Sequence, residues 1–326
     1  MKRSNLKKNI LITGGAGFIG SNFVNLCANT EEIGSIFVLD KLTYAGDLNR
    51  ITNSLKLANV EFIHEDIINI ENFPNVISSI DFLINFAAET HVDNSINSPS
   101  EFITTNIVGT FKLLEACRLS NKSIRFMQIS TDEVYGSVSV DASETDMLNP
   151  SSQYSASKAS ADLLTLANWK THNQDVLISR SCNNFGPQQH REKLIPKSIL
   201  KALSGEDLEL YSEGLNIREW IYVEDNCEII FNILKKGKPG EIYNIGTGIR
   251  KSNMEVASAI LELLPDSNSK IRHITDRLGH DFSYRLNIEK MRGETQEMQI
   301  TNFMDGLEKV INSYKNASSN FKSGAK

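Results

Sequence analysis

The sequence predicts an α/β fold in which a doubly wound parallel sheet is followed by a smaller C-terminal α/β domain. Short apolar runs rich in β-branched residues alternate with amphipathic stretches through the first part of the 326-residue chain. A glycine-rich turn follows the first of these runs. After about residue 185 the runs become shorter and glycine and proline become more frequent, which indicates a second domain.

The apolar runs of the first part are predicted to be the strands of the large sheet. They are Asn9–Thr13, Ser35–Asp40, Val60–His64, Asp81–Phe86, Arg125–Ser130 and Val176–Arg180. The helices expected between them include Asn22–Asn29, Ile103–Arg118 and Ser155–His172. Strands that alternate with helices in this way imply parallel pairing.

The shorter runs after about residue 185 are predicted to be strands of the second domain. They are Leu208–Tyr211, Glu219–Val223 and Glu241–Ile245. We therefore predict one domain over residues 1–185, to which some later segments return, and a second, interleaved domain over residues 186–326.

Composition and charge argue against several classes of function. Hydrophobic residues make up 40% and charged residues 23%, as in an ordinary globular enzyme. No apolar run approaches the roughly 18 residues of a membrane helix, and the basic N-terminus leads into a strand rather than a signal peptide. The net charge of -6 argues against a nucleic-acid-binding surface. The four cysteines lack metal-ligand spacing, so we expect no metal site and a reduced, cytoplasmic setting.

The segment Thr13–Gly20 predicts a Rossmann-like dinucleotide site. It reads Gly-x-Gly-x-x-Gly from Gly15 and Gly-x-x-Gly-x-x-Gly from Gly14, after a strand and at the start of a helix. Glycine permits the tight turn, the approach of the backbone to a pyrophosphate, and close helix–strand packing. The phosphates would then lie at the helix N-terminus. Taken alone, the motif is also compatible with a glycine-rich turn that binds nothing.

Asp40 ends the second predicted strand, 20 residues after Gly20. A carboxylate at this position accepts hydrogen bonds from the adenosine ribose and repels a 2′-phosphate, so the sequence favours NAD over NADP. The neighbouring Lys41 weakens that preference. Asp66 follows the third strand and is placed to meet the adenine edge, although an acidic residue in a surface turn is the alternative.

Tyr154 and Lys158 are four residues apart and lie on one face of a predicted helix. An ammonium near a phenol favours the phenolate, so we expect Lys158 to lower the pKa of Tyr154 and also to hold the nicotinamide ribose. Thr131 stands at the C-terminal end of the preceding strand, where the ligand crevice of such a sheet opens, and can bind the same substrate oxygen. The spacing by itself is also found on solvated helix faces.

Asp132 and Glu133 stand 22 and 21 residues before Tyr154. They add a separate acid and base to the hydride chemistry that Tyr154 indicates, as oxidation followed by elimination of water requires. Neighbouring residues of a strand point to opposite faces, so both acids reach one pocket only if the chain leaves extended geometry at Thr131. An exposed acidic turn is the alternative.

On these residues the chain resembles the dTDP-glucose 4,6-dehydratases, a family of extended short-chain dehydrogenases/reductases. The matching segments are Thr13–Gly20, Leu39–Gly46, Phe86–Asp93, Thr105–Thr110, Ile129–Gly136, Tyr154–Lys158, Asn183–Pro187, Glu192–Pro196, Ile217–Trp220, Tyr243–Gly246 and Asp276–Asp281. The glycine motif and Tyr-x-x-x-Lys belong to the whole superfamily, whereas Thr131-Asp132-Glu133 is far more specific. Sugar-nucleotide epimerases usually lack the acidic pair, and GDP-mannose dehydratases and UDP-glucuronate decarboxylases have only the glutamate.

The resemblance implies an NAD-dependent hydro-lyase that converts dTDP-glucose to dTDP-4-keto-6-deoxyglucose and water. Tyr154, with Thr131 and Lys158, takes the proton from O4 while hydride leaves C4. The new ketone acidifies the C5 proton, which Glu133 removes, and protonated Asp132 donates to the departing O6 hydroxyl. Hydride then returns to C6 and Tyr154 or a relay returns a proton to C5, so the product forms and NAD is regenerated.

The resemblance also implies which residues bind the two ligands. The cofactor set is Gly14, Gly17, Phe18, Ile19, Gly20, Asp40, Lys41, Leu42, Thr43, Asp66, Ile67, Phe86, Ala87, Ala88, Thr105, Tyr154, Lys158 and Asn184. The nucleotide-sugar set is Thr90, Thr131, Asn183, Lys193, Leu194, Tyr211, Arg218, Asn244, Arg277 and His280. The arginines suit bidentate phosphate binding. A homodimer through helices near Ile107–Arg118 and Ala156–His172, which would bury an apolar four-helix face, is implied as well.

Several alternatives stay open. A 4-epimerase or decarboxylase on the same scaffold would use Tyr154 and NAD but would not need Asp132. A UDP- or CDP-sugar is compatible with the departures from the family, which usually has Pro at Leu278 and a Leu-Gly-Trp-x-Pro stretch where Met291–Thr295 stands. A non-enzymatic NAD-sensing or scaffold protein is the remaining alternative. Loss of one water identifies a dehydratase, and an isobaric product identifies an epimerase.

Overall fold

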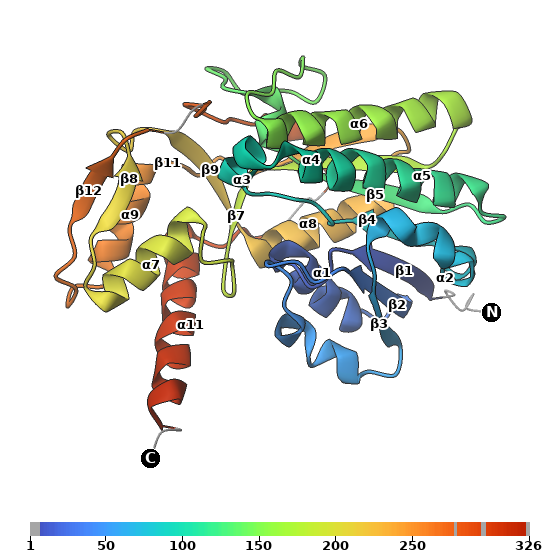
Figure 1. Cartoon of the computed structure of the whole chain (residues 1–326). Coiled ribbons are helices and arrows are strands. Elements are labelled where there is room, and N and C mark those ends of the chain that lie inside the picture. The colour runs from blue at the N-terminus through green and yellow to red at the C-terminus, as the bar shows by residue number, and fades with distance from the viewer. Residues whose placement is uncertain (1–6, 277–278, 295–297, 324–326) are drawn as a thin grey trace.

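The large sheet dominates the computed structural model, which describes residues 7–276, 279–294 and 298–323 (Figure 1). Its strands are β1 (Lys8–Thr13), β2 (Ile33–Asp40), β3 (Val60–His64), β4 (Phe82–Asn85), β5 (Arg125–Thr131), β6 (Val176–Ser181) and β10 (Glu241–Ile245). They pair in the order β10-β6-β5-β4-β1-β2-β3, and all neighbours are parallel. The predicted doubly wound parallel sheet is therefore confirmed.

Helices cover both faces of this sheet (Figure 1). One face carries α1 (Phe18–Ala28) and α8 (Val223–Lys236), which contact each other, and the other carries α5 (Thr110–Leu119) and α6 (Gln153–His172). The shorter helices nearby are α2 (Pro74–Ser79), α3 (Val92–Asn97), α4 (Pro99–Phe102) and α10 (Glu289–Glu294). Because both faces are covered, the interior strand β6 is buried along its whole length.

Neighbouring residues of β1 show how the core is divided. Ile10 and Ile12 are fully buried in the cluster that contains Phe23 of α1, whereas Leu11 is fully buried in the cluster that contains Leu113 of α5. This alternation follows from the two-residue period of a strand. It fixes the register of the sheet, because a shift by one residue would exchange the two faces.

The predicted helix Ile103–Arg118 is divided in the structure. Residues Ile103–Gly109 form a π-helical segment, and α5 begins at Thr110. A Cβ atom on Gly109 would collide with the Ile67 side chain, so a side chain from a distant segment packs directly against the backbone at this junction. π-helical turns of this kind are rare and often lie at functional sites.

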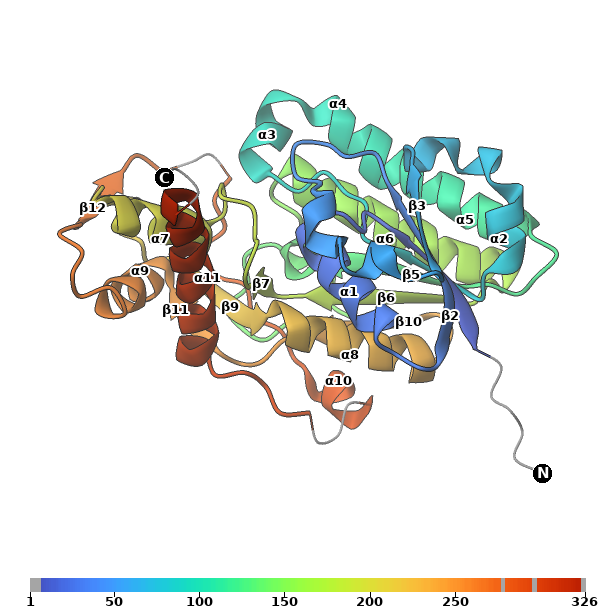
Figure 2. The ribbon, with the colours of Figure 1, turned by 90° about the horizontal axis from the view of Figure 1, so that it is seen from below.

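Within the described residues, the second part of the molecule consists of small sheets with helices packed beside them (Figure 2). Its elements are β7 (Asn183–Phe185), β8 (Leu208–Tyr211), β9 (Ile217–Tyr222), β11 (Arg250–Ser252), β12 (Ile271–Ile274), α7 (Leu194–Ser204), α9 (Asn253–Glu262) and α11 (Phe303–Ser323). β9 lies between β7 and β11, and β8 pairs with β12. The strand predicted at 241–245 forms, but it joins the edge of the large sheet as β10 because it pairs with β6.

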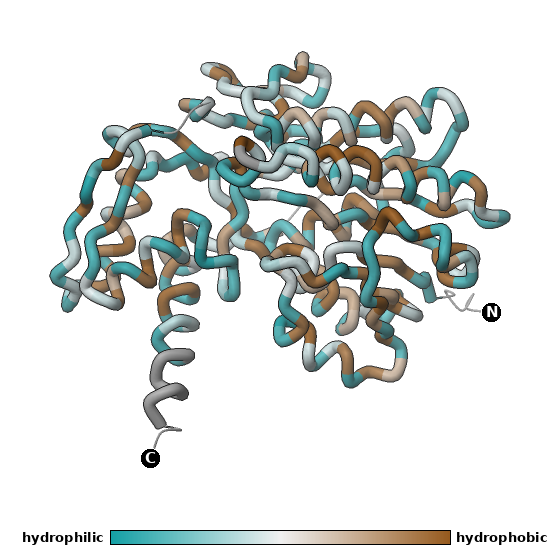
Figure 3. The backbone as a smooth tube through the Cα atoms, in the orientation of Figure 1, coloured by the Kyte–Doolittle hydropathy of each residue, from teal (hydrophilic) through white to brown (hydrophobic). Residues whose placement is uncertain are grey.

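The second part has its own apolar core. Phe185 packs its ring against Trp220 of β9 and Phe303 of α11, with ring centroids 6.3 and 5.1 Å apart. Phe303 and Leu307 of α11 are buried in the same cluster, and Figure 3 shows hydrophobic and hydrophilic residues alternating along this helix, as expected for an amphipathic helix. Among the helices within the described ranges, none has the length and apolarity that crossing a bilayer requires.

Candidate active site

A cavity of about 300 Å³ lies at the carboxyl ends of β1, β2, β4 and β5. The strand order reverses between β1 and β4, and open α/β sheets bind ligands at such a point. The predicted cofactor residues that line the cavity are Gly14, Gly17, Phe18, Ile19, Gly20, Asp40, Lys41, Thr43, Asp66, Ile67, Phe86, Ala87, Ala88, Thr105, Tyr154, Lys158 and Asn184. The structure thus gathers nearly the whole predicted cofactor set around one space.

The glycine turn leaves the start of α1 open toward this cavity. Gly14 has φ of 67°, and a Cβ atom there would lie 2.5 Å from the Ala87 nitrogen, so only glycine fits. Gly17 is the N-cap of α1, and no side chain of the described residues caps the helix. The first-turn amides are therefore free to receive a phosphate.

Asp40 joins the glycine turn to the segment after β2. One carboxylate oxygen accepts from the Ala16 backbone N–H at 2.9 Å and the other from the Leu42 N–H at 2.8 Å. Leu42, predicted to bind the cofactor, therefore holds Asp40 and does not itself line the cavity. The Lys41 ammonium lies 3.3 Å from the Asp66 carboxylate, so the cation that weakened the preference for NAD is paired.

Several buried polar atoms at the cavity have no hydrogen-bond partner within the described part of the chain. They are the Ser130 Oγ, Asp132 Oδ2, Asn184 Oδ1 and Gln189 Oε1 atoms. Buried polar groups are almost always satisfied in native proteins, so these atoms fit a polar ligand. Together with the open helix N-terminus and the acidic end of β2, they make the site a good fit for NAD.

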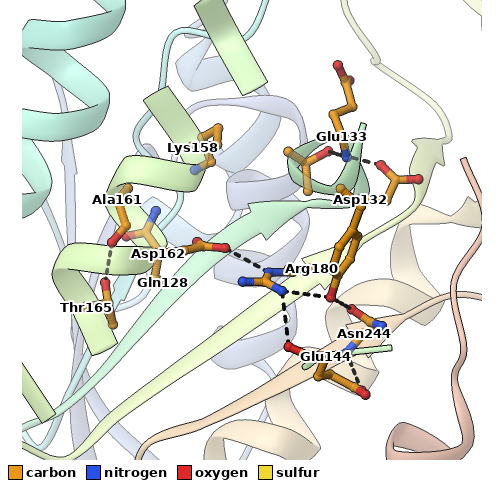
Figure 4. Close-up of polar contacts among 12 residues, drawn as sticks. Gln128, Asp132, Glu133, Glu144, Lys158, Ala161, Asp162, Thr165, Arg180 and Asn244 are labelled. Carbon is orange, nitrogen blue, oxygen red and sulfur yellow. Dashed lines mark hydrogen bonds and ion pairs between the residues drawn. The ribbon is translucent and has the colours of Figure 1, made fainter. Parts of the chain in front are cut away.

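The chain leaves extended geometry directly after Thr131. Residues Asp132–Tyr135 form a 3₁₀ turn, here called η5, capped by the Thr131 hydroxyl, which accepts from the Glu133 N–H at 3.3 Å. The same hydroxyl donates to Asp132 Oδ1 at 3.1 Å. Both acids line the cavity, and their side chains leave the turn in different directions (Figure 4). The sequence required the chain to leave extended geometry at Thr131 for both acids to reach one pocket, and the structure shows this change.

Asp132 is the more deeply buried acid of the pair, with 2% of its surface exposed. Burial, followed by the neighbouring Glu133 carboxylate, raises the pKa of Asp132 well above its ordinary value. This shift favours the protonated form of Asp132. A buried, protonated carboxylic acid is suited to donate a proton to a leaving group.

Tyr154 and Lys158 lie near the start of α6, where Ser152 and Ser155 form a capping box. Burial lowers the pKa of Lys158 to about 8, and its ammonium donates to the Ile129 carbonyl at 2.6 Å. Burial, followed by Glu133 and Asp132, raises the pKa of Tyr154. The expected lowering of this pKa is therefore wrong for the protein without ligands, because burial and two carboxyl groups outweigh the lysine.

The predicted substrate residues fall into two groups. Thr90, Thr131, Asn183 and Lys193 line the cavity, and the Lys193 ammonium donates to the Thr90 carbonyl at 3.2 Å. Leu194, Tyr211, Arg218 and His280 belong to the second part of the molecule and do not line this cavity. Arg277 lies outside the described residues.

Arg218 and His280 are nevertheless held in defined positions. The Arg218 guanidinium donates to the backbone carbonyls of Asp281 at 2.9 Å and Phe282 at 3.3 Å, and it lies 4.3 Å from the Tyr284 ring centroid. The positive charge of Arg218 partly offsets the rise in the pKa of Asp132. Arg218 therefore lies near the acidic turn. The His280 and Tyr211 rings meet edge to face at 5.7 Å.

Asn244 is placed away from this cavity, and its substrate role stays a prediction. It is fully buried in β10. Its amide nitrogen donates to the Ala142 carbonyl at 2.8 Å and the Asn287 carbonyl at 3.2 Å, and its oxygen accepts from the Tyr135 hydroxyl at 2.8 Å. The pairing of β10 with β6 places this side chain in the interior, where its hydrogen-bonding capacity is used.

Sequence reasoning assigned Lys193 of the loop between β7 and α7 to the site but missed other residues of this loop. Gln189, His190 and Glu192 of this loop line the cavity. The Glu192 carboxylate accepts from the Tyr44 hydroxyl at 3.4 Å and lies 3.3 Å from His190 and 3.8 Å from His91. No local pattern could have revealed these contacts with Tyr44 and His91, because they join segments far apart in the chain.

Comparisons with known proteins agree with this geometry. The family model described as GDP-mannose 4,6 dehydratase matches residues 11–310. The Low-salt glycan biosynthesis protein Agl12 of Haloferax volcanii is 46% identical over 94% of this chain and 98% of its own length. The dTDP-glucose 4,6-dehydratase of Streptomyces niveus is 42% identical over 94% of this chain and 92% of its own length.

Solved structures share the fold over nearly the whole chain. A dTDP-glucose 4,6-dehydratase of Streptomyces venezuelae, solved with NAD bound, superposes with a TM-score of 0.90 at 38% identity, covering 95% of this chain and 98% of its own. A UDP-glucuronic acid 4-epimerase of Bacillus cereus superposes with a TM-score of 0.89 at only 25% identity, over 95% and 99%. The chain therefore belongs to the dTDP-glucose 4,6-dehydratase-like family of NAD-dependent epimerases and dehydratases, within the extended short-chain dehydrogenases/reductases.

Proposed function

We propose that the chain dehydrates dTDP-glucose to dTDP-4-keto-6-deoxyglucose. One observation carries this proposal: the turn that bears Asp132 and Glu133 opens into the same cavity as Tyr154. A 4-epimerase has no elimination step and needs no second acid. The curated relatives between 38% and 42% identity that carry the name dTDP-glucose 4,6-dehydratase support the choice of substrate.

The cofactor proposed for this cavity is NAD. The glycine turn and α1 would hold its pyrophosphate, Asp40 its adenosine ribose, and Lys158 its nicotinamide ribose. When bound, NAD supplies hydride acceptance at the start of the reaction and hydride return at its end. The pairing of Lys41 with Asp66 supports the preference for NAD over NADP, because it removes the cation that a 2′-phosphate would use.

Tyr154 and Thr131 would act on the sugar O4. Both line the cavity, and the Thr131 hydroxyl opposes the rise in the pKa of Tyr154. Tyr154 takes the O4 proton as C4 is oxidised, and Thr131 orients the oxygen. Lys158 provides the nearby positive charge that favours the phenolate.

Glu133 and Asp132 would divide the elimination between them. The 4-ketone acidifies the C5 proton, which Glu133 removes as general base. Asp132, whose pKa is raised by burial, supplies the proton with which the O6 hydroxyl leaves as water. One proton is taken and one is given, so the step is balanced without a metal or a further reactant.

The nucleotide diphosphate would extend toward the second part of the molecule. Lys193 lies at the cavity, and Arg218 is held near Asp132 by the backbone of residues 281 and 282. Arginine suits phosphate binding because its planar donors match phosphate oxygens. The proposed substrate set is completed by Asn183, Leu194, Tyr211, Arg277 and His280.

The four cysteines are free and buried, which is consistent with a reduced, cytoplasmic setting.

The experiment that tests this function is a substrate comparison. The purified protein is incubated with dTDP-glucose, UDP-glucose, CDP-glucose and UDP-N-acetylglucosamine, and the products are weighed by mass spectrometry. Loss of one water from dTDP-glucose, in preference to the other sugars, is expected. An isobaric product would indicate an epimerase. A protein that binds NAD but converts none of these sugar nucleotides would instead support the NAD-sensing alternative.

A further inference from the structure

A buried polar network lies directly behind the catalytic residues and is not used by the proposed reaction. It consists of Asp162 of α6, Arg180 of β6, Tyr135 of η5 and Asn244 of β10, and we call it the Arg180 network (Figure 4). Arg180 and Asp162 are 2% and 0% exposed. A buried ion pair needs a reason, because desolvation cancels much of its attraction.

Asp162 competes for Lys158. It lies four residues after Lys158 on α6, the spacing at which a lysine and an aspartate on a helix pair with each other. In the structure Asp162 accepts instead from the Arg180 Nε at 2.9 Å, and the Lys158 ammonium donates to the Ile129 carbonyl. Arg180 thus pairs with Oδ2 of the carboxylate that would otherwise draw Lys158 away from the cavity, and no described group forms a hydrogen bond with Oδ1.

The other end of Arg180 holds the acidic turn. Its Nη1 donates to the Tyr135 hydroxyl at 2.8 Å, and its guanidinium carbon lies 4.8 Å from the centroid of the same ring. The Tyr135 hydroxyl in turn donates to Asn244. Tyr135 is the last residue of η5, whose first two residues are Asp132 and Glu133. Arg180 therefore links α6, which carries the tyrosine and the lysine, to the turn that carries both acids.

We propose that Arg180 is a positioning residue with two arms. The arm to Asp162 keeps the Lys158 ammonium at the cavity, and the arm to Tyr135 fixes the turn that presents Asp132 and Glu133. The proposal rests on the proposed function for the meaning of these positions. It assigns no contact with substrate to Arg180, which is sealed from the cavity.

The charges support the first arm. Asp162 raises the pKa of both Lys158 and Tyr154, and Arg180 is the largest of the influences that hold down the pKa of Asp162 itself. Lys158 also lowers the pKa of Asp162, so it is a positive charge that stays near this carboxylate when Arg180 is removed. Removal of Arg180 is therefore expected to act on the lysine first.

The test compares Arg180→Met, Asp162→Asn and the double variant. The dissociation constant for NAD is measured by calorimetry without any sugar nucleotide, and kcat with dTDP-glucose is measured separately. Arg180→Met is expected to weaken NAD binding about tenfold and to lower kcat about 10- to 100-fold, the cost of a small displacement of catalytic groups. The double variant is expected to regain the affinity for NAD, because no carboxylate remains to capture Lys158, and to keep part of the loss in kcat.

Arg180→Lys separates the two arms and is the safer variant to fold. A lysine keeps a charge beside Asp162 but cannot reach Tyr135 at the same time, so NAD affinity is expected to stay within twofold and kcat to fall. Arg125→Met is the control, because it breaks an arginine–aspartate pair with Asp175 (3.0 Å) at the start of β5, away from the catalytic residues at the end of that strand. It is expected to lower the Tm and to leave kcat and NAD affinity unchanged.

The outcomes decide the proposal separately from the function. If the double variant binds NAD as weakly as Arg180→Met, or if Arg180→Lys loses as much affinity as Arg180→Met, Arg180 is merely structural and the proposal is wrong. Because NAD affinity is measured without a sugar nucleotide, a wild-type protein that turns over no substrate would overturn the proposed function and still leave this comparison decisive.

Discussion

Asp132 and Glu133 are neighbours in the chain, yet they lie in different environments. Asp132 is almost completely buried and its pKa is raised, whereas Glu133 is partly exposed at the cavity. A carboxyl group that keeps its proton can act as an acid, and one that reaches solvent can ionise and act as a base. The difference arises at Thr131, where the strand ends and η5 turns the two side chains apart.

Glu133→Gln is expected to stop elimination and to leave oxidation at C4. Loss of a general base costs about 10²–10⁴ in rate, while Tyr154 and Thr131 are untouched. With dTDP-glucose, the variant should accumulate reduced cofactor, seen by absorbance, and release little dehydrated product, seen by mass spectrometry. Tyr154→Phe is the control and should show neither signal. A Glu133→Gln protein that forms product at nearly the wild-type rate would show that another group removes the C5 proton.

Asp132→Asn is expected to stabilise the folded protein at neutral pH and to lower its activity. The raised pKa of Asp132 contributes stability that is fully present below the ordinary value and is lost as pH rises toward the folded value. Asparagine does not ionise, so the variant does not lose this stability as pH rises. The Tm of the variant should therefore exceed that of the wild type by a margin that grows as pH rises above about 4, the ordinary pKa of an aspartate.

Asp175→Asn supplies the comparison for this Tm series. Asp175 forms a partly exposed pair with Arg125, and its removal should lower the Tm. An Asp132→Asn protein whose Tm stays below the wild-type value throughout the pH range would show that Asp132 is ionised in the fold, and its role as the acid would then be lost.

The residue types of the site could be read from the sequence, but the direction of each side chain could not. Asp40, Tyr154 and Lys158 were predictable because their spacing from a strand end or within one helix places them on a known face. Asn244 was not, because it is buried by the pairing of β10 with β6, which no local pattern reveals. The same holds for Glu192, whose partners come from distant loops.

At the scale of elements, the glycine turn shows how local backbone geometry creates a ligand site. Gly14→Ala is expected to abolish measurable NAD binding, because the added Cβ would press against the Ala87 backbone beside the open start of α1. Calorimetry with NAD measures this loss, and circular dichroism shows whether the variant keeps its secondary structure.

Gly205→Ala is the matched control for that turn. Gly205 ends α7 with φ of 75°, almost the same as Gly14, but a Cβ atom there meets no described atom within 4 Å. Its cost is the left-handed backbone alone, about 1 kcal/mol, so NAD binding should be unchanged. If both variants bind NAD equally well, the close approach of Gly14 to Ala87 has no role in the cofactor site.

The elements themselves were predictable where local pattern and packing agree. The run Val60–His64 forms the predicted strand without any change of bounds, because its apolar residues end at polar segments on both sides. The stretch after Ile103 was expected to be one regular helix and instead begins as a π-helical segment, because Ile67 packs against the backbone at Gly109. That contact depends on the tertiary fold and leaves no local signal.

At the scale of the whole molecule, the proposed site draws on both parts of the chain. The large sheet supplies the cofactor residues, and the loop before α7 supplies Gln189, His190 and Glu192. The division into domains at residue 185 stays a prediction, since β7 begins at Asn183 and β10 returns to the large sheet. Because the chain crosses between the two parts more than once, they are linked at more than one point.

The outer faces of α5 and α6 support the proposed homodimer. Phe111 and Leu119 of α5 are 44% and 68% exposed, and Leu163 of α6 is 59% exposed. The two helices contact each other on the same side of the sheet (Figure 1). Exposed apolar side chains gathered on neighbouring helices commonly mark an interface between subunits.

Charged substitutions on this face are expected to separate the subunits. Phe111→Glu combined with Leu163→Lys removes apolar area and places unpaired charges where two copies would meet, and a desolvated charge is costly. Sedimentation velocity should show the wild type as a dimer and the double variant as a monomer, with the far-UV circular dichroism unchanged. Met147→Lys is the control, because Met147 is 88% exposed and belongs to neither helix, so its replacement should leave the dimer intact. A double variant that sediments with the wild type would place any interface on another surface.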